Sequence, residues 1–173
     1  MNFIKITKFD TANGLGIGTV LWVCGCEHKC YGCHNPQTHD PFNGKLFTSK
    51  DFDALISSIK SPQITRLTFS GGDPLFPMNR SEIAKIAKEV KRIFPTKKIW
   101  LYTGYEFEQI LEFSPKEFLK NIDVIVDGKF ILSKKDLTLK YCGSSNQRII
   151  DVKKTLDFKF VMLFDLEKTF IKV

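Results

Sequence analysis

The sequence predicts an α/β fold built on a parallel sheet. Short apolar runs alternate along the chain with segments in which apolar residues recur at helical spacing, which is the pattern of strands connected by helices. The chain has 173 residues, of which 43% are hydrophobic and 16 are Phe, enough for a core of large side chains. We therefore expect a single domain over residues 1–173, in which residues 156–173 form an apolar C-terminal extension.

The apolar runs predict five strands, and most of these runs lead into a turn that contains glycine. The C-terminal segment 158–173 also has strand character. The five predicted strands span residues 18–23, 64–69, 98–102, 122–126 and 148–152.

Helices are predicted between these strands. Thr48 and Asp51, three residues apart, form a capping pair at the start of the first helix. The second helix has its apolar residues at helical spacing and is stopped by Pro95. The third is short, and Pro115 can begin a further one. The predicted helices span residues 49–59, 81–94 and 106–113.

Composition limits the classes of function. The formal net charge is +7, which fits either a Lys-rich solvated surface or attraction to an acidic protein or an anionic electron donor. The lysines are spread along the chain without a basic stripe, so nucleic-acid binding is not expected. No apolar run reaches the ~18 residues of a membrane span, and the first residues do not resemble a signal peptide. We expect a cytoplasmic protein that acts without a membrane, in which five cysteines indicate metal or redox chemistry rather than disulfides.

Loops that carry cysteine, glycine or polar residues follow four of the predicted strands. In parallel α/β folds the carboxyl ends of the strands meet at one edge of the sheet, where active sites are built. We therefore expect four loops to come together there. They are the cysteine loop from Cys26 to Cys33, Gly71-Gly72-Asp73, Thr103-Gly104 and Asp127-Gly128.

The cysteine loop carries Cys26, Cys30 and Cys33, separated by three residues and then by two. Three thiolates can hold three irons of a [4Fe–4S] cluster and leave the fourth iron open to a substrate or cofactor. A structural zinc site is the alternative, with His34, His39 or Cys24 as the fourth ligand. The absence of a second C-x-x-C knuckle disfavours zinc. We expect Cys24 to be a spectator and the isolated Cys142 to be an ordinary thiol.

Gly71, Gly72 and Asp73 form a second candidate motif. A glycine pair after a strand can be a plain turn. It can also let the backbone approach a ligand closely and present N–H and C=O groups to it, here beside a carboxylate. A bound amino acid needs both kinds of group.

Together these motifs resemble the radical S-adenosylmethionine superfamily. Within it, the segments Cys30-Tyr31-Gly32-Cys33-His34-Asn35, Thr103-Gly104-Tyr105, Asp127-Gly128-Lys129-Phe130 and Gly143-Ser144-Ser145-Asn146-Gln147-Arg148 resemble the activating components of anaerobic ribonucleoside-triphosphate reductase. The resemblance covers roughly residues 10–155. It implies a partial, open parallel β/α barrel of the radical S-adenosylmethionine type, because the chain is too short for a full barrel.

The resemblance also implies roles for individual residues. Cys26, Cys30 and Cys33 would hold the [4Fe–4S] cluster, whose open iron chelates S-adenosyl-L-methionine. The residues that would bind this cofactor are Gly71, Gly72 and Asp73 at its methionine end, Thr103 and Asp127 at its methionine or ribose part, Asn146, and His34 near the adenine. Thr103 and Asp127 can equally be cap or turn residues. Asp73 stands where many members of the superfamily have Glu.

The implied activity is reductive cleavage of S-adenosylmethionine to a 5′-deoxyadenosyl radical, which makes a glycyl radical on a large partner, the anaerobic ribonucleotide reductase. A one-electron donor such as a flavodoxin-like protein is implied as well. Two alternatives stay open. One is a small radical enzyme acting on a small molecule, similar to 7-carboxy-7-deazaguanine synthase, and the other is a zinc-stabilised interaction module without catalysis.

Overall fold

Seven strands form one sheet in the computed structural model, which describes residues 1–167. The strand order is β3-β1-β2-β4-β5-β6-β7. All five predicted strands are present, with ends shifted by at most a few residues. Two strands at the N-terminal side, β1 and β3, were not predicted. The strands are β1 (Asn2–Asp10), β2 (Gly18–Val23), β3 (Lys45–Leu46), β4 (Arg66–Gly71), β5 (Lys98–Tyr102), β6 (Val124–Asp127) and β7 (Arg148–Asp151).

Only the centre of the sheet is parallel. Strands β2, β4, β5 and β6 run in one direction, whereas β1 is antiparallel to both β2 and β3, and β7 is antiparallel to β6. Strands β3 and β7 are the two edges, so the sheet is open. The fold is therefore a mixed α/β domain with an open sheet. Of the predicted strands, β7 departs from the expected parallel arrangement, and β1, which was not predicted, is also antiparallel to its neighbours.

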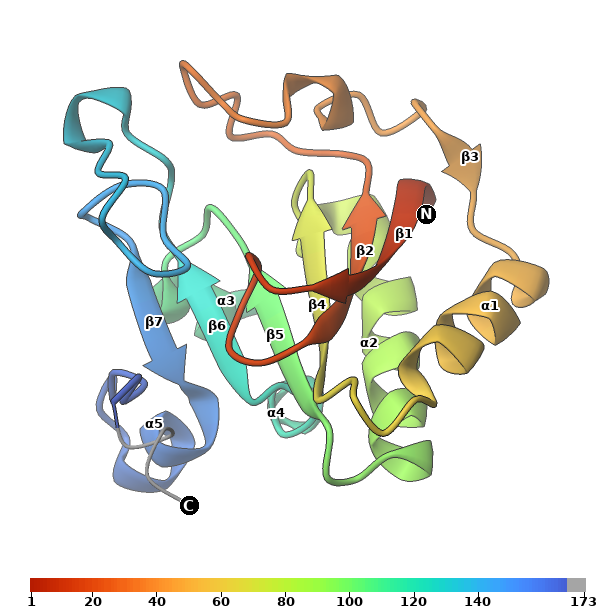
Figure 1. Cartoon of the computed structure of the whole chain (residues 1–173). Coiled ribbons are helices and arrows are strands. Elements are labelled where there is room, and N and C mark those ends of the chain that lie inside the picture. The colour runs from red at the N-terminus through yellow and green to blue at the C-terminus, as the bar shows by residue number, and fades with distance from the viewer. Residues whose placement is uncertain (168–173) are drawn as a thin grey trace.

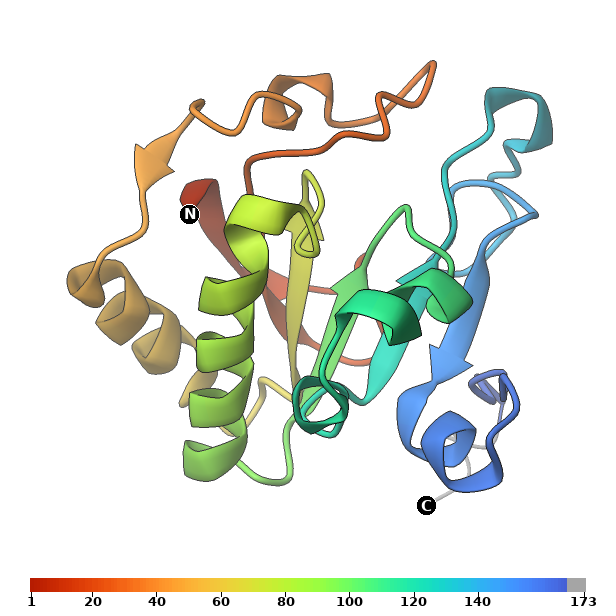
Figure 2. The ribbon, with the colours of Figure 1, turned by 180° about the vertical axis from the view of Figure 1, so that it is seen from behind.

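Four helices cover one face of the sheet. Figures 1 and 2 show α2, α3 and α4 behind and in front of the strands, respectively, with α1 at the side of the sheet. At the start of α1, the backbone N–H of Thr48 donates to the Asp51 carboxylate at 3.0 Å, as the predicted capping pair requires. Helix α2 begins at Pro77, a turn before the predicted start, because proline suits the first helical position. The helices are α1 (Ser49–Ile59), α2 (Pro77–Ile93), α3 (Phe107–Phe113) and α4 (Lys116–Leu119).

The main core lies between these helices and the sheet. Alternate strand residues such as Phe69, Leu101 and Ile125 are fully buried against the apolar side of α2, where Ile83 and Val90 are also buried. Successive strand residues point to opposite faces, so Trp100, Val124 and Val126 form a second, smaller cluster on the other face.

The loop between β1 and β2 covers this second face. Leu15 packs beside Trp100, and Gly14 adopts φ +129°, at a place where a Cβ would lie 2.8 Å from the indole ring. Arg66, completely buried, forms an ion pair with Asp10 at 2.7 Å and donates to the Thr68 hydroxyl at 2.7 Å. A paired and hydrogen-bonded arginine thus links this loop to the sheet.

The C-terminal part differs from its prediction. A short helix, α5 (Val152–Phe158), follows β7, and the Asp151 side chain accepts a hydrogen bond from the Lys154 N–H at its start. Beyond the helix, Leu163 forms an isolated antiparallel bridge with Ile150. This bridge is the strand character seen within residues 158–167, and residues 168–173 lie outside the described part of the chain.

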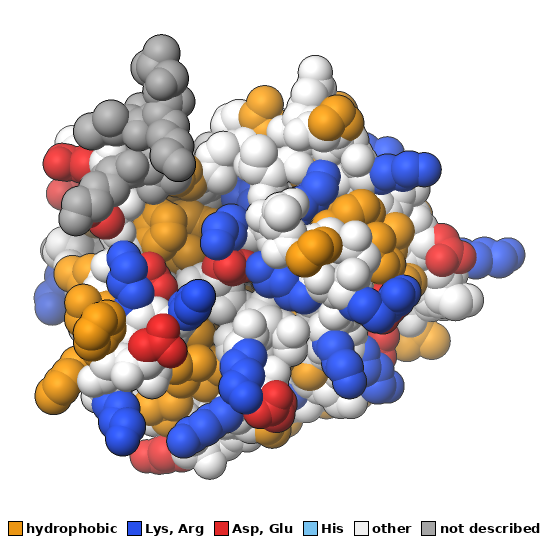
Figure 3. Space-filling model, turned by 90° about the horizontal axis from the view of Figure 1, so that it is seen from below, with side chains coloured by type: hydrophobic (Ala, Val, Ile, Leu, Met, Phe, Trp, Pro, Cys, Tyr) orange, Lys and Arg blue, Asp and Glu red, His pale blue; other side chains and the backbone are white. Residues whose placement is uncertain are grey.

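Charged side chains of both signs are mixed on the surface below the sheet, opposite the ends of β2 and β6 that carry the long loops (Figure 3). Lys and Arg side chains lie beside Asp and Glu there, with apolar patches between them. Within residues 1–167, no helix has the length and apolar character needed to span a bilayer.

Candidate functional site

A cavity of about 380 Å³ lies at the carboxyl ends of the parallel strands. The cysteine loop after β2 and the long loop between β6 and β7 extend beyond this end of the sheet (Figure 1). The predicted convergence of four strand-end loops is confirmed, since each contributes lining residues. Among the predicted site residues, those that line the cavity are Cys26, Cys30, Cys33, His34, Gly71, Gly72, Asp73 and Thr103.

Other lining residues were not among the predicted cluster ligands or cofactor-binding residues, although His39 had been named as a possible zinc ligand. Ala12 and Asn13 come from the loop between β1 and β2, and Tyr102 comes from the end of β5. The β6–β7 loop adds its own side chains. These further residues include His28, His39, Phe130, Tyr141, Cys142 and Gln147.

The three cysteines present their sulfurs to backbone N–H groups. Burial raises the pKa of Cys26 to about 11, although hydrogen bonds from the N–H groups of His28 and Lys29 act in the opposite direction. Burial also raises the pKa of Cys30, against a hydrogen bond from the Phe130 N–H. The N–H of Asn35 donates to Cys33 Sγ at 3.4 Å.

This donor set fits an iron–sulfur cluster. Hydrogen bonds to cysteine sulfur are among the means by which proteins stabilise such clusters and tune their potentials. The metal displaces the thiol protons when it binds. In residues 1–167, no three or more His, Cys, Asp or Glu side chains are grouped around a point that one metal ion could occupy. A [4Fe–4S] cluster takes one iron per cysteine, so its ligands need not meet at a point.

The two remaining cysteines lie in different surroundings. Cys24 is fully buried, and its sulfur lies close to Gly44, where an added Cβ would be 3.2 Å from it. It is not among the lining residues. Cys142 lines the cavity, and burial raises its pKa to about 11.

Gly71 and Gly72 are required by close approach between strand-end loops. A Cβ on Gly72 would lie 2.6 Å from the Gly25 carbonyl oxygen and 2.8 Å from that of Thr38. A Cβ on Gly71 would lie 2.6 Å from the Val23 carbonyl oxygen, and Gly71 has φ +108°. The N–H of Gly72 donates to Val23 at 2.8 Å. The pair therefore joins the ends of β2 and β4, in addition to lining the cavity.

Asp73 is a hydrogen-bonding hub with a side chain that is only 2% exposed. One carboxylate oxygen, Oδ2, accepts from His28 Nε2 at 2.7 Å, from the Thr103 hydroxyl at 2.9 Å and from the Gly104 N–H at 3.0 Å. The other oxygen accepts from the Leu75 N–H at 2.7 Å. The carboxylate thus ties together the loops that follow β2, β4 and β5.

Two more side chains hold this region. Asn79, buried in the first turn of α2, donates through Nδ2 to the carbonyl of Cys24 at 2.8 Å and to that of Asp73 at 2.9 Å. His34 is exposed on the cysteine loop, and its ring centroid lies 5.2 Å from that of Phe130. Residues of the cysteine loop and of the β6–β7 loop thereby meet at the cavity.

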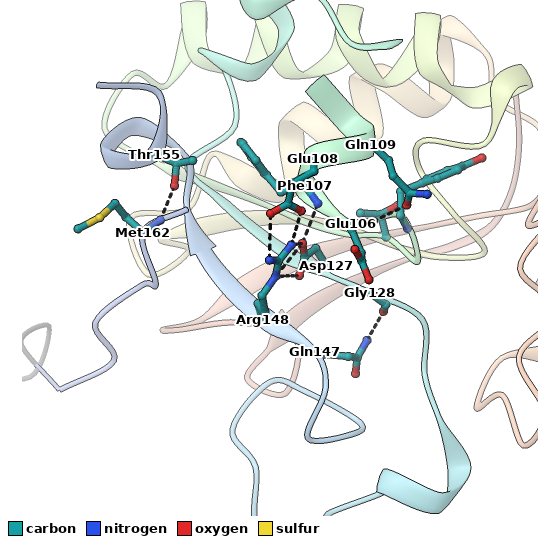
Figure 4. A network of polar contacts seen from close by, with 12 residues as sticks. Glu106, Phe107, Glu108, Gln109, Asp127, Gly128, Gln147, Arg148, Thr155 and Met162 are labelled. Carbon is teal, nitrogen blue, oxygen red and sulfur yellow. Dashed lines mark hydrogen bonds and ion pairs between the residues drawn. The ribbon is translucent and has the colours of Figure 1, made fainter. Parts of the chain in front are cut away.

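Asp127 and Asn146 do not line this cavity. The buried Asp127 carboxylate binds Arg148, with Nη2 2.5 Å from Oδ2, and accepts from the Phe107 N–H at 2.8 Å, as Figure 4 shows. Asn146 donates to the Lys129 carbonyl at 2.9 Å across the β6–β7 loop, and its buried Oδ1 has no partner.

The segment Gly143–Arg148 fastens the β6–β7 loop. Gln147 donates to the Gly128 carbonyl at 2.9 Å (Figure 4) and accepts from the N–H groups of Gly143 at 2.8 Å and Ser144 at 3.2 Å. The Ser144 hydroxyl accepts from the Ile131 N–H at 3.2 Å. These contacts explain why amide and hydroxyl side chains cluster in this segment.

His28 and Asn79 are the functional candidates that sequence reasoning missed. The only sequence signal for His28 was its place between Cys26 and Cys30, and nothing pointed to Asp73, 45 residues away, as its partner.

The open α/β sheet and the three-cysteine cavity at its strand ends define the class, an iron–sulfur protein. A family model described as a 4Fe-4S single cluster domain matches residues 12–150. The chain belongs to the family of anaerobic ribonucleoside-triphosphate reductase-activating proteins. Relatives with this name come from Enterobacteria phage T4, Vibrio cholerae and Escherichia coli K12, and are 46%, 40% and 38% identical to the chain. The alignments cover 86%, 86% and 85% of this chain, and 93%, 97% and 96% of the relatives.

Proposed function

We propose that this chain is a radical S-adenosylmethionine activase for an anaerobic ribonucleotide reductase. The observation that carries the proposal is the meeting of three cysteines with the Gly71–Asp73 loop in one cavity, in a chain of this family. A [4Fe–4S] cluster held there would supply one electron to bound S-adenosylmethionine. That electron would split the sulfonium C–S bond, giving methionine and a 5′-deoxyadenosyl radical that would take a hydrogen atom from a glycine of the partner.

The residues have separate tasks in this proposal. Cys26, Cys30 and Cys33 hold the cluster, and the backbone N–H groups around their sulfurs stabilise the thiolate form. Gly71 and Gly72 lie beside the methionine end of the cofactor.

Asp73 and Thr103 act at the methionine end of the cofactor as well, because the hydrogen bond between them fixes the loops around that end. His34, with Phe130, offers a ring surface to the adenine. Asp127 and Asn146 serve the site through the loops that they hold.

The partner completes the site. The cavity opens at the end of an open sheet, and Tyr31 at the tip of the cysteine loop is 84% exposed. A large reductase that covers this end would exclude water and side reactions during hydrogen-atom transfer. The electron comes from a one-electron donor such as a flavodoxin-like protein, and we place the reaction in the cytoplasm.

The open sheet is, in the same proposal, a partial form of the radical S-adenosylmethionine barrel. Strands β2, β4, β5 and β6 supply its parallel part, and the loop between β1 and β2 packs on the face that carries Trp100. Residues 1–173 then form one such domain.

Anaerobic reconstitution with iron and sulfide tests the proposal. We expect a brown protein that, once reduced by dithionite, releases 5′-deoxyadenosine from S-adenosylmethionine and forms a glycyl radical signal in electron paramagnetic resonance when an anaerobic ribonucleotide reductase is added. Cys30→Ala should lose the cluster and both activities, with the fold retained by circular dichroism. Cys24→Ala is the matched control, because Cys24 is buried away from the cavity, and it should keep its iron.

Different failures have different meanings. A colourless protein that binds zinc and has no affinity for S-adenosylmethionine would contradict the proposal as a whole. Release of 5′-deoxyadenosine without any glycyl radical on the reductase would contradict the assigned substrate and favour a small-molecule enzyme.

A further inference from the structure

His28 connects the cysteine loop to the loops after β4 and β5. Its side chain is 5% exposed, and its Nε2 lies 2.7 Å from Oδ2 of Asp73. A carboxylate only accepts hydrogen bonds, so Nε2 carries the hydrogen and donates it. A hydrogen bond to a buried charged acceptor is stronger than one between neutral groups.

Packing fixes the His28 ring as well. Its centroid lies 4.5 Å from that of Tyr105, with the rings nearly perpendicular at 75°. Gly104 lies directly against the imidazole, where any Cβ would overlap the ring. The His28 ring is therefore held in one position, between the loop that carries the cysteines and the loop that carries Thr103 and Gly104.

Asp73, the acceptor, is itself immobilised. Its backbone N–H donates to the Gly25 carbonyl at 2.7 Å, and its carbonyl accepts from Asn79 at 2.9 Å. It is also close enough to Cys26 for its charge to contribute to the raised pKa of that thiol. The tether from His28 thus ends on a rigid point beside the first cysteine.

The cysteine loop has a second tether at its surface. The Tyr105 hydroxyl hydrogen-bonds the exposed carboxylate of Glu27, in competition with water. An exposed pair contributes less than a buried one, because its groups are equally well solvated when they separate. Of the two adjacent tethers, we expect the buried hydrogen bond of His28 to contribute more to holding the cysteine loop in place.

We propose that His28 is a positioning residue, which holds the cysteine loop in its cluster-binding arrangement through Asp73 before any iron is bound. The role in cluster retention rests on the proposed function, whereas the tether itself can be tested on the metal-free protein. Residues that orient metal ligands without touching the metal change metal affinity by about 10- to 100-fold when removed.

The metal-free protein provides the first test. In His28→Ala we expect hydrogen exchange at residues 26–33 to quicken about 10-fold or more, while exchange in the buried strands β4 and β5 stays unchanged. His28→Gln should restore much of the protection, since its Nε2 can also donate to Asp73. Lys29→Asn is the matched control in the same loop, because Lys29 is exposed at φ +46°, which asparagine tolerates.

The reconstituted protein provides the second test. We expect His28→Ala to lose its cluster, followed by its absorbance under a chelator, about 10-fold faster than wild type, with His28→Gln in between and Lys29→Asn like wild type. If His28 acts through Asp73, His28→Ala should add little to the loss rate in an Asp73→Asn background, as expected for one shared interaction.

Two outcomes would overturn the inference. One is wild-type exchange and cluster lifetime in a folded His28→Ala variant. The other is His28→Gln behaving like His28→Ala in both measurements, which would mean that ring packing, and not the hydrogen bond, is what matters. A chain that binds no cluster at all would refute the proposed function, and the exchange test would still decide the tether.

Discussion

Arg148, the first residue of β7, binds the buried carboxylate of Asp127, the last residue of β6, with Nη2 2.5 Å from Oδ2. The same guanidinium group binds Glu108 of α3 with Nη2 2.7 Å from Oε2 (Figure 4). The hydrogen bonds to Asp127 and Glu108 raise the pKa of Arg148 above its usual range. One side chain therefore fixes both ends of the long β6–β7 loop and the helix beside it.

Replacing Arg148 by Met should destabilise the fold strongly. The change leaves the Asp127 carboxylate, 1% exposed, without its cation. Breaking a buried pair costs about 3–5 kcal/mol, and the partial exposure of Arg148 places the expected loss near the lower value. Urea unfolding measures it. Glu108→Gln is the control, since this exposed carboxylate contributes about 0–1 kcal/mol, and equal losses in the two variants would contradict the prediction.

Acid should weaken the link between Asp10 and Arg66. Burial alone would raise the pKa of Asp10, but hydrogen bonds from Arg66 and Asn13 outweigh it and keep the pKa below its usual value. A pKa depressed by folding stabilises the protein above the unfolded-state value of about 3.9, and this stabilisation is lost as pH falls through the folded-state pKa.

The measurement for Asp10 is the free energy of unfolding of wild type and Asp10→Asn between pH 6 and about pH 2.5. The advantage of the wild type should be largest at pH 6 and shrink as pH falls. A difference between the two proteins that is constant over this range would show that the carboxylate charge is not what stabilises the loop.

Gly72→Ala should distort the junction of β2 and β4. Its Cβ would lie 2.6 and 2.8 Å from two backbone carbonyl oxygens, which cannot rotate away as a side chain could. Overpacking of this kind costs about 1–3 kcal/mol, and we expect binding of S-adenosylmethionine to the reconstituted protein to weaken as well.

Gly128→Ala is the matched control for Gly72→Ala. Gly128 also lies beside the cavity, but a Cβ there has no neighbour nearer than 3.8 Å, so the cost is limited to about 1–2 kcal/mol for its φ of +90°. The expected costs in unfolding free energy overlap, so titration with S-adenosylmethionine is the measurement that separates the two variants. Identical binding by both would be evidence against close backbone approach as the reason for glycine at position 72.

Asn79→Ala should lower the free energy of unfolding by more than the few side-chain atoms it removes would suggest. The amide group donates to the buried carbonyls of Cys24 and Asp73. The Asp73 carbonyl also accepts from the Phe76 N–H at 3.0 Å, so Asn79→Ala leaves the Cys24 carbonyl without its donor, at a cost of about 1–3 kcal/mol. Asn121→Ala removes a similar hydrogen bond to Glu117 on the exposed surface and should cost well under 1 kcal/mol. Thermal unfolding of both variants provides the comparison.

The sheet centre was predictable because its strands are short apolar runs that end in glycine turns. Strand β1 was missed because only Phe3 of its nine residues is buried, so the apolar pattern of an inner strand is absent. The antiparallel direction of β7 depends on pairing with β6, which no local pattern encodes. Helix α5 begins at Val152, directly after β7, so its first residue continues the apolar run of the predicted strand 148–152.

The candidate site was predictable as a location and as a set of loops, because cysteine spacing and glycine turns are local signals. The hydrogen-bond partners of the side chains within the site were not predictable. Asp73 and Thr103 were expected at a ligand, and the structure shows Asp73 hydrogen-bonded to both Thr103 and His28. Such partnerships join residues far apart in sequence, so they emerge only when the strands are assembled.

The loop that carries Gly14 also contributes to the wall of the cavity. Ala12 and Asn13 line the cavity, while Gly14 beside them lies against Trp100 and Leu15 packs on the cluster that contains Trp100. Shortening the segment 11–15 would therefore enlarge the cavity, and larger side chains in this segment would fill it. The size of the ligand that fits could thus be changed here without altering the cysteines.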